Sequence, residues 1–405
     1  MTLVSQSQMD EAFESQPPRI SIVCPHFWPI SGARELGVAE LATQLKSDGC
    51  EVEIITGRWS KSWPAQFHFQ EIPIRRVGRN SNSPWSSIRY IRNLQRALEE
   101  NRPDGIIVFG LGDEAWTVAK SMTGRIPYVV RLDNFCFGPR DGKPNLSSKQ
   151  IQILQSADRV FAESEWTYRR LQAHPSLESV KVSVLPIGLQ LPAGPLRSPT
   201  RQATSRMSLC DAHPVLTINP VQPLAVSCAP LNGDDGMLDL IWAWKKVTQV
   251  MPNARLWVIG EGIRSREVWE KVIDLDLVHS VIMPGSFDDL GIVFEAADLY
   301  IHPLRTSQTC SNLDRAMAAG LSPVATTTEF TQNRISHGSN GIVIAPAQPG
   351  ALAEAIMYAL NQPELRARLG ERAASSARKF DIAKAAHPFL DALDRHWRLR
   401  TKQQV

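Results

Sequence analysis

Short apolar runs alternate with amphipathic stretches along most of this 405-residue chain, and this alternation restricts its fold more than any other feature. Residues 20–23 predict a buried strand, and Val38, Leu41, Ala42 and Leu45 then recur at the spacing of one helix face. Strand candidates that alternate with helical patterns predict parallel β–α units, and therefore an α/β fold. Four more strand candidates follow in the first half, at 52–56, 105–109, 128–132 and 160–162.

The alternation stops once and then starts again, which predicts two domains. Residues 191–213 contain prolines, serines, threonines and arginines without an apolar period, so we expect a linker there. The two domains are then residues 19–190 and 214–380. We expect a disordered tail at 1–18 and a closing C-terminal helix and tail at 381–405. Strand candidates in the second half lie at 215–218, 256–259, 281–283, 299–302, 324–325 and 342–344.

Composition and charge exclude several classes of protein. The net charge of +3 is too small to imply nucleic-acid binding by itself, so no nucleic-acid partner is expected. The six cysteines lie far apart and form no Cys-x-x-Cys pair, so neither a zinc site nor a disulfide framework is predicted. No apolar run reaches the roughly 18 residues that a membrane span needs, and residues 1–18 lack a secretion signal. We expect a cytoplasmic protein without a bound metal or cofactor.

Two glycine-containing turns fall where open parallel sheets bind their ligands. Gly32 lies in the turn before the first helix, where a small residue lets backbone N–H groups approach an anionic phosphate closely. Gly260 and Gly262 open a later βα loop at the carboxyl edge of a sheet. An ordinary βα turn is the alternative for any one of these glycines.

Several longer segments resemble the retaining glycosyltransferases of the GT-B type, family 4. The resemblance extends over about residues 20 to 382 and implies two Rossmann-like domains that face each other across a cleft. The first domain would bind the acceptor and the second the nucleotide sugar, and the last helix would cross back onto the first domain. The segments that carry the resemblance are LATQLKSDGCEVEIIT at 41–56, ADRVFAESE at 157–165, VSVLPIG at 182–188, AMAAG at 316–320, GSNG at 338–341 and PELRARLG at 363–370.

The donor segment departs from the family pattern at its charged positions. The family has two glutamates before the Ala-Met-Ala-x-Gly sequence, and Ser307 and Arg315 stand there in this chain, with Asp314 as a neighbouring carboxylate. Two family cations that bind the donor diphosphate align with Pro230 and Asp235, neither of which can bind a phosphate by charge. Four arginines could supply replacement charge: Arg264, Arg266, Arg305 and Arg315.

Asp133 is the candidate catalytic residue, because a family His-Asp pair aligns with Asp133 and Asn134. A carboxylate there could accept hydrogen bonds from a sugar or take the proton of the acceptor. A loop-capping aspartate is the alternative. The candidate donor-binding residues are Gly32, Gly260, Gly262, Arg305, Ser307, Asp314 and Arg315.

The resemblance implies transfer of a hexose from a UDP- or GDP-sugar to a saccharide or lipid-linked acceptor, with retention of the anomeric configuration. An inactive relative that serves as a binding or partner protein is the alternative, because several donor positions have changed. Arg89, Arg92 and Arg96 fall on one helical face, after Trp85, and could contact an anionic membrane from the cytoplasmic side. A solvated face on a core-packed helix is the alternative for these arginines.

Overall fold

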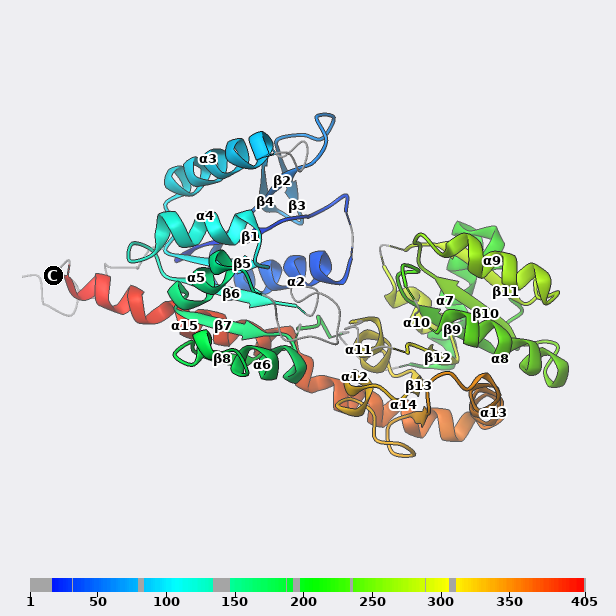
Figure 1. Ribbon diagram of the computed structural model, residues 1–405. Helices are drawn as coiled ribbons and strands as arrows, with labels where there is room; N and C mark the ends of the chain where they lie inside the picture. Colours follow the sequence, from blue (N-terminus) through cyan, green and yellow to red (C-terminus); the bar gives the residue numbers. More distant parts are fainter. Residues whose placement is uncertain are drawn as a thin grey trace, which may run out of the picture. The chain divides into compact units, whose positions relative to one another are not determined.

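The computed structural model divides the chain into two compact units (Figure 1). One consists of Met1–Pro186 and Ala385–Val405, and the other of Ile187–Lys384. Each described unit is built around its own sheet of mainly parallel strands, which confirms the predicted α/β class with two parallel-sheet domains. The structure describes residues 17–30, 32–78, 84–133, 146–186, 188–191, 197–233, 236–287, 289–305 and 311–403.

The described part of the first unit has an eight-stranded sheet of order β3-β4-β2-β1-β5-β6-β7-β8. Neighbouring strands pair in parallel, apart from β3, which runs antiparallel to β4. Every residue of the inner strand β5 is buried, as its apolar sequence predicts for a sheet covered on both faces. The strands are β1 Arg19–Cys24, β2 Glu51–Arg58, β3 Gln66–Phe69, β4 Ile72–Gly78, β5 Gly105–Phe109, β6 Tyr128–Leu132, β7 Arg159–Ala162 and β8 Val182–Val184.

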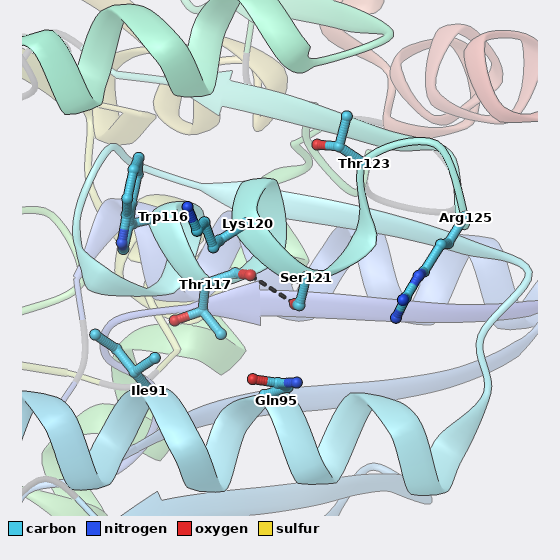
Figure 2. Close-up of a pocket in the computed structure, with 8 residues that line it drawn as sticks. All are labelled: Ile91, Gln95, Trp116, Thr117, Lys120, Ser121, Thr123 and Arg125. Carbon is cyan, nitrogen blue, oxygen red and sulfur yellow. Dashed lines mark hydrogen bonds between the residues drawn. The ribbon is translucent and has the colours of Figure 1, made fainter.

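Helices cover this first sheet, and two of them, α3 and α4, border a cavity of about 490 Å³ (Figure 2). The C-terminal helix α15 also packs here, since Phe389 contacts Phe161 at a ring distance of 4.8 Å and Leu393 lies against Gly105. The helices are α2 Ala33–Ser47, α3 Pro84–Asn101, α4 Asp113–Met122, α5 Ser148–Ser156, α6 Glu165–Gln172 and α15 Ile382–Gln403, with a short 3-10 helix, η2, at Pro175–Leu177.

The described part of the second unit has a six-stranded, wholly parallel sheet of order β11-β10-β9-β12-β13-β14. Successive residues of β10 point to opposite faces of the sheet, so Leu256 and Val258 enter one core while Trp257 and Ile259 enter the other. The strands are β9 Leu224–Cys228, β10 Arg255–Ile259, β11 Val281–Gly285, β12 Leu299–His302, β13 Ser322–Thr326 and β14 Ile342–Ile344. The helices are α7 Pro199–Ala212, α8 Met237–Val250, α9 Ser265–Asp274, α10 Gly291–Ala296, α11 Ser311–Ala318, α12 Glu329–Gln332, α13 Pro349–Leu360 and α14 Pro363–Ala377, with 3-10 helices η3 Pro214–Leu216 and η4 Arg378–Phe380.

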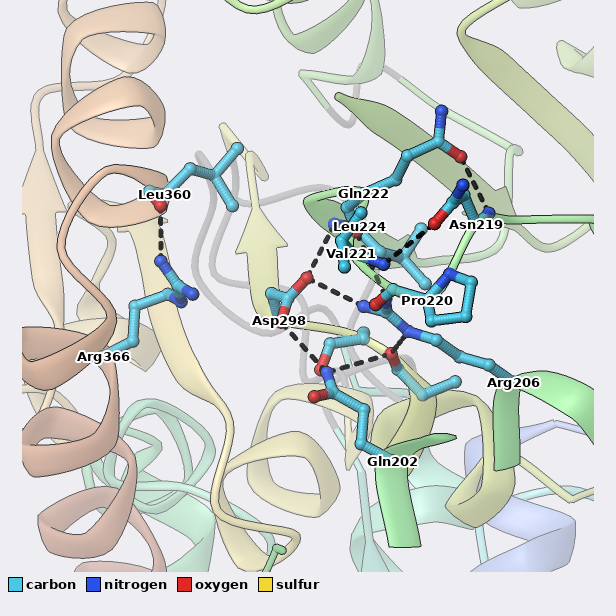
Figure 3. A network of polar contacts seen from close by, with 12 residues as sticks. Gln202, Arg206, Asn219, Pro220, Val221, Gln222, Leu224, Asp298, Leu360 and Arg366 are labelled. Carbon is cyan, nitrogen blue, oxygen red and sulfur yellow. Dashed lines mark hydrogen bonds and ion pairs between the residues drawn. The ribbon is translucent and has the colours of Figure 1, made fainter. Parts of the chain in front are cut away.

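Most of the predicted linker is a packed helix, so that prediction was wrong for residues 199–212. Helix α7 begins after Ser198, whose side chain accepts a hydrogen bond from the Arg201 backbone N–H. Arg206 is buried and donates to Asp298 at 2.9 Å and to the Ala296 carbonyl at 2.9 Å (Figure 3). The helix lacks a strong apolar period because polar contacts fix much of it to the second unit, and the sequence pattern therefore missed it.

One strand of the second unit was also misplaced by the sequence. Residues 214–216 form the 3-10 helix η3, which begins with Pro214, and the strand of this region is β9, ten residues further on. Strand β9 contains the small residues Ala225, Ser227 and Cys228, which give a weak strand signal. Its place between β10 and β12 depends on its neighbours rather than on its own propensity.

Candidate functional site

Three loops come together at the carboxyl edge of the second sheet, and glycines allow the contact. The loop after β9 leads to α8, the loop after β10 to α9 and the loop after β12 to α11. A Cβ atom on Gly236 would collide with the Pro303 carbonyl, and one on Gly260 with the Ala229 carbonyl. A Cβ atom on Gly262 would likewise collide with the backbone of Leu231. The φ angles of 76° at Gly236 and 137° at Gly260 also favour glycine.

Backbone hydrogen bonds join the first two of these loops. The Ala229 N–H donates to the Ile259 carbonyl at 3.1 Å, and the Leu231 N–H donates to the Glu261 carbonyl at 3.0 Å. The Arg264 N–H in turn donates to the Leu231 carbonyl at 2.9 Å. The loops are therefore fixed to each other, and the N-termini of α8 and α9 start from the same edge of the sheet. Helix N-termini carry partial positive charge and favour anions.

Two of the arginines proposed as replacement cations lie at this edge, and each is held by a carboxylate. Arg305 forms a bidentate ion pair with Asp239 in the first turn of α8, with Nε–Oδ2 at 2.7 Å and Nη2–Oδ1 at 2.6 Å. Arg264 forms a similar pair with Glu267 of α9, at 2.6 and 2.7 Å. The pairing orients both guanidinium groups and offsets part of their charge.

The other candidates of this unit differ in accessibility. The guanidinium of Arg266 pairs with Glu270 and its side chain is 89% exposed, which fits a solvated surface arginine. Arg315 is half-buried on α11. Pro230 is exposed in the loop after β9. Two further candidates, Ser307 and Asp235, lie outside the described residues.

Asp314 faces the interior of the second unit rather than its surface. Its Oδ1 accepts a hydrogen bond from Arg334 Nε at 2.7 Å, and both side chains are nearly buried. The Arg334 guanidinium also lies 3.7 Å from the ring centre of Phe330. Burial raises the pKa of Asp314, whereas the charge of Arg334 acts in the opposite direction. Asp314 therefore fixes α11 to the segment after α12, and its carboxylate is already engaged.

His302, at the end of β12, is a residue that the sequence did not single out. Its side chain is 1% exposed, and its Nε2 atom has no hydrogen-bond partner in the described part of the structure. Burial lowers the pKa of His302 to about 3, with a smaller effect from the charge of Arg334, so the imidazole is neutral. The only sequence signal for it is a histidine inside an otherwise apolar strand.

The first unit joins the predicted residue Asp133 to the helix that begins just after Gly32. Asp133 follows β6 directly, and its Oδ2 accepts a hydrogen bond from Arg34 Nε at 2.6 Å. Arg34 lies in the first turn of α2, two residues after Gly32. Gly32 is extended, with φ of −168°, so its conformation alone does not require glycine. The predicted partner Asn134 lies outside the described residues.

Glu35 is a further carboxylate beside the Gly32 turn. Its Oε2 atom would lie only 2.7 Å from a Cβ atom placed on Gly32. Burial raises the pKa of Glu35, and the charge of Asp133 acts in the same direction while that of Arg34 opposes it. A phosphate at this turn would therefore meet a carboxylate as well as backbone N–H groups. The sequence did not single Glu35 out, because an acidic residue in a first helical turn is common.

Aromatic side chains surround the loop that follows β1. His26 stacks on Trp59 at 4.6 Å, and Trp28 contacts Phe67 at 5.9 Å. The guanidinium of Arg76 lies 4.2 Å from the ring centre of Phe67 and donates to the Trp28 carbonyl at 2.5 Å. Trp28 nevertheless remains 47% exposed, next to the Gly32 turn. The same edge of the sheet thus presents an exposed indole ring as well as carboxylates.

Neither a metal cluster nor a membrane span is present among the residues that the structure describes. No group of three or more His, Cys, Asp or Glu side chains is arranged to hold a metal ion. No described helix has the length and apolar character that crossing a membrane requires. Arg89, Arg92 and Arg96 are exposed on α3, as their helical spacing predicts.

Both units match known protein families. Residues 34–188 match the family described as "Glycosyl transferase 4-like domain", and residues 211–376 match "Glycosyl transferases group 1". This chain belongs to the group 1 glycosyltransferases of the GT-B type. Membership of this family supports a glycosyltransferase activity and does not favour the alternative of an inactive relative.

Individual relatives are distant in sequence but similar over their whole length. A D-inositol 3-phosphate glycosyltransferase of Streptomyces scabiei is 22% identical over 432 residues, which cover 96% of this chain and 94% of the relative. Sucrose-phosphate synthase of Thermosynechococcus elongatus superposes with a TM-score of 0.77 at 16% identity, over 94% of this chain and 100% of the other. Anabaena HepE in complex with UDP-glucose gives a TM-score of 0.71 at 16% identity, over 93% and 99% of the two chains.

Proposed function

We propose that this glycosyltransferase moves a hexose from a UDP- or GDP-sugar to a saccharide or lipid-linked acceptor, with retention of the anomeric configuration. The observation that carries the proposal is the edge of the second sheet, where Gly236, Gly260 and Gly262 allow backbone to pack on backbone. The N-termini of α8 and α9 start there, and such an edge suits a diphosphate. A fold neighbour, HepE, was solved in complex with UDP-glucose, which supports a nucleotide-sugar donor.

Charge that develops on the leaving diphosphate would be stabilised by fixed dipoles and by Arg305. Helix N-termini need no rearrangement during the reaction, and this preorganisation makes electrostatic stabilisation effective. Arg305 is aimed by its bidentate contact with Asp239, so it keeps a fixed orientation at the rim of the donor edge. The chemistry does not require a divalent metal, because these groups can carry the charge stabilisation.

On the acceptor side we assign the first unit, with Asp133 as the group nearest the chemistry. Arg34 fixes the orientation of the Asp133 carboxylate, which can accept a hydrogen bond from a sugar hydroxyl or take its proton. The exposed indole of Trp28 offers an apolar platform for a sugar ring or for the apolar chain of a lipid-linked acceptor. The supporting observation is that both features lie beside the Gly32 turn.

Calorimetric titration of UDP-, GDP- and ADP-sugars into Arg305→Gln and Arg266→Gln tests the donor site. Both variants remove one paired arginine from the second unit, but only Arg305 belongs to the proposed site. We expect Arg305→Gln to weaken binding of the preferred donor by about tenfold, the loss of one charge-assisted contact, and Arg266→Gln to leave it unchanged. Equal effects of the two variants, or no binding of any nucleotide sugar by the wild type, would contradict the proposal. The anomeric configuration of the product, measured by NMR, tests retention separately.

A further inference from the structure

The cavity between α3 and α4 lies outside both candidate sites. Its lining comes from α3, from α4 and from the turn after α4, rather than from the loops at the carboxyl edge of the sheet (Figure 2). Ile91 and Gln95 of α3 face Thr117 and Ser121 of α4 across the space. A volume of about 490 Å³ is within the usual range for small-molecule sites. The cavity is thus large enough for a sugar residue and independent of the donor and acceptor groups.

Three polar side chains of the lining already donate hydrogen bonds to neighbouring groups, which leaves their oxygen atoms to accept further hydrogen bonds. The Thr117 hydroxyl donates to the Asp113 carbonyl at 2.6 Å, and the Ser121 hydroxyl donates to the Thr117 carbonyl at 2.6 Å. The amide nitrogen of Gln95 donates to Glu99 at 2.9 Å, which leaves its carbonyl oxygen available. Thr117 is buried, so the oxygens of Ser121 and Gln95 are the ones that can accept hydrogen bonds from the hydroxyl groups of a ligand.

Two lysines contact the ring of Trp116 at one end of the cavity, and Lys120 is the one that belongs to the lining. The ammonium groups of Lys120 and Lys149 lie 5.8 and 5.5 Å from the centre of the same Trp116 ring. Neither lysine forms an ion pair within the described part of the chain, and two like charges at one ring repel each other. An anion bound in the cavity beside Lys120 would offset part of this positive charge.

The surrounding surface adds to the positive potential. Arg125 lines the cavity at its other end. On α3, Arg92 and Arg96 follow the lining residues by one position each, about 100° further round the helix, and both are exposed. The carboxylate of Glu99 also reaches this rim, where it accepts a hydrogen bond from Gln95 Nε2. The balance of charge therefore favours an anionic ligand.

We propose that the cavity between α3 and α4 is a binding site for an anionic saccharide, a sugar that carries a carboxylate or a phosphate. The sugar hydroxyls would donate to Ser121 and Gln95, and the anionic group would lie near Lys120. A hollow lined by acceptor oxygens distinguishes such a ligand from a flat membrane surface, which would need exposed apolar side chains to insert. The site is separate from glycosyl transfer and does not depend on the donor or acceptor assignments.

Calorimetry with a galacturonic acid tetramer and with glucose 6-phosphate tests the proposal, with maltotetraose as the neutral probe. We expect one or both anionic sugars to bind the wild type, and maltotetraose to bind at least about tenfold more weakly. Lys120→Gln/Lys149→Gln should weaken anionic-sugar binding by about tenfold or more, since it removes the contact of Lys120 and the neighbouring positive charge at Trp116. The matched control is Lys181→Gln/Lys246→Gln, which makes the same charge change at two exposed lysines elsewhere and should bind like the wild type.

A second pair of variants separates the cavity from general surface charge. Ser121→Leu fills the cavity without a change of charge and should abolish binding, whereas Ser121→Ala leaves the space open and should weaken binding by less than about tenfold, the loss of one neutral hydrogen bond. Thermal unfolding of each variant checks that it folds. Wild-type affinity in Ser121→Leu, or equal losses in both lysine pairs, would overturn the proposal. Binding to phosphatidylglycerol vesicles without binding of either anionic sugar would overturn it as well, because the face would then be a membrane contact.

Discussion

Two of the ion pairs in the second unit join groups that lie far apart in the sequence. Arg305 and Asp239 lie 66 positions apart, and Asp314 and Arg334 lie 20 apart. The first pair is partly exposed, whereas the second is nearly buried. Burial decides the consequence of breaking each pair, since a charge left alone in the interior cannot be solvated by water.

At the scale of single residues, we expect Asp314→Asn to reduce the free energy of unfolding by about 3–5 kcal/mol. The change leaves the buried guanidinium of Arg334 without a carboxylate partner. Urea denaturation followed by circular dichroism measures the loss. Glu270→Gln is the matched control, because it breaks the exposed Arg266–Glu270 pair of the same unit and should have little effect. A loss in Asp314→Asn no larger than in the control would show that Asp314 has another role.

Among the secondary-structure elements, α7 shows that a helix can depend on polar contacts rather than on an apolar stripe. Its Gln202 donates to Asp298 at 2.9 Å, and Arg206 donates to the same carboxylate and to backbone carbonyls (Figure 3). Asp298 precedes β12 and also accepts from the Leu224 N–H of β9. The network thereby ties α7 to two central strands of the second sheet.

For α7, Arg206→Ala should expose the helix to proteolysis between residues 199 and 212 and destabilise the second unit by about 3–5 kcal/mol. The reason is that Asp298 and several carbonyl groups lose their buried partner. Limited proteolysis with mass spectrometry locates the first cuts. Met207→Ala, on the same helix but 66% exposed, should be cut like the wild type. Rapid cleavage of the wild type inside α7 would show that the polar network does not hold the helix.

At the scale of the whole molecule, the first unit is made from two separate parts of the chain. Residues from Ala385 onward belong to it, although more than 190 residues of the second unit precede them in the sequence. Phe389 and Leu393 are buried against β7 and β5. The second unit is continuous, from Ile187 to Lys384, and has its own cores on both faces of its sheet.

Removal of all residues after 384 should therefore destabilise the first unit and leave the second folded. Burial of Phe389 and Leu393 alone contributes roughly 1.5–3 kcal/mol each, and their loss exposes the apolar surface beneath. Differential scanning calorimetry of the truncated chain should show the second-unit transition, and the separate fragment 187–384 should show the same one. Two transitions unchanged from those of the full chain would mean that α15 adds nothing to the first unit.

Sequence patterns predicted most inner strands correctly, because an apolar, β-branched run between turn residues has few alternatives to a buried parallel strand. Residues 105–109 and 128–132 are β5 and β6, and 256–259 lies within β10. The same reasoning failed for β9, whose small residues form a strand only between their neighbours, and for α7, whose contacts are polar. Local sequence patterns thus predicted the strands that are marked by their own apolar side chains. They missed the elements whose structure depends on contacts with other parts of the chain.

The sequence by itself determined the α/β class, the two-unit organisation and the positions of Gly32, Gly260 and Gly262, since these follow from periodicity and from short motifs. Only the tertiary structure decided which backbone approaches Gly260, which carboxylate engages each arginine, and that Asp314 faces inward. The pairing of Arg34 with Asp133, 99 positions apart, is of the same kind. Such contacts join loops that meet only when the strands align, so no local pattern encodes them.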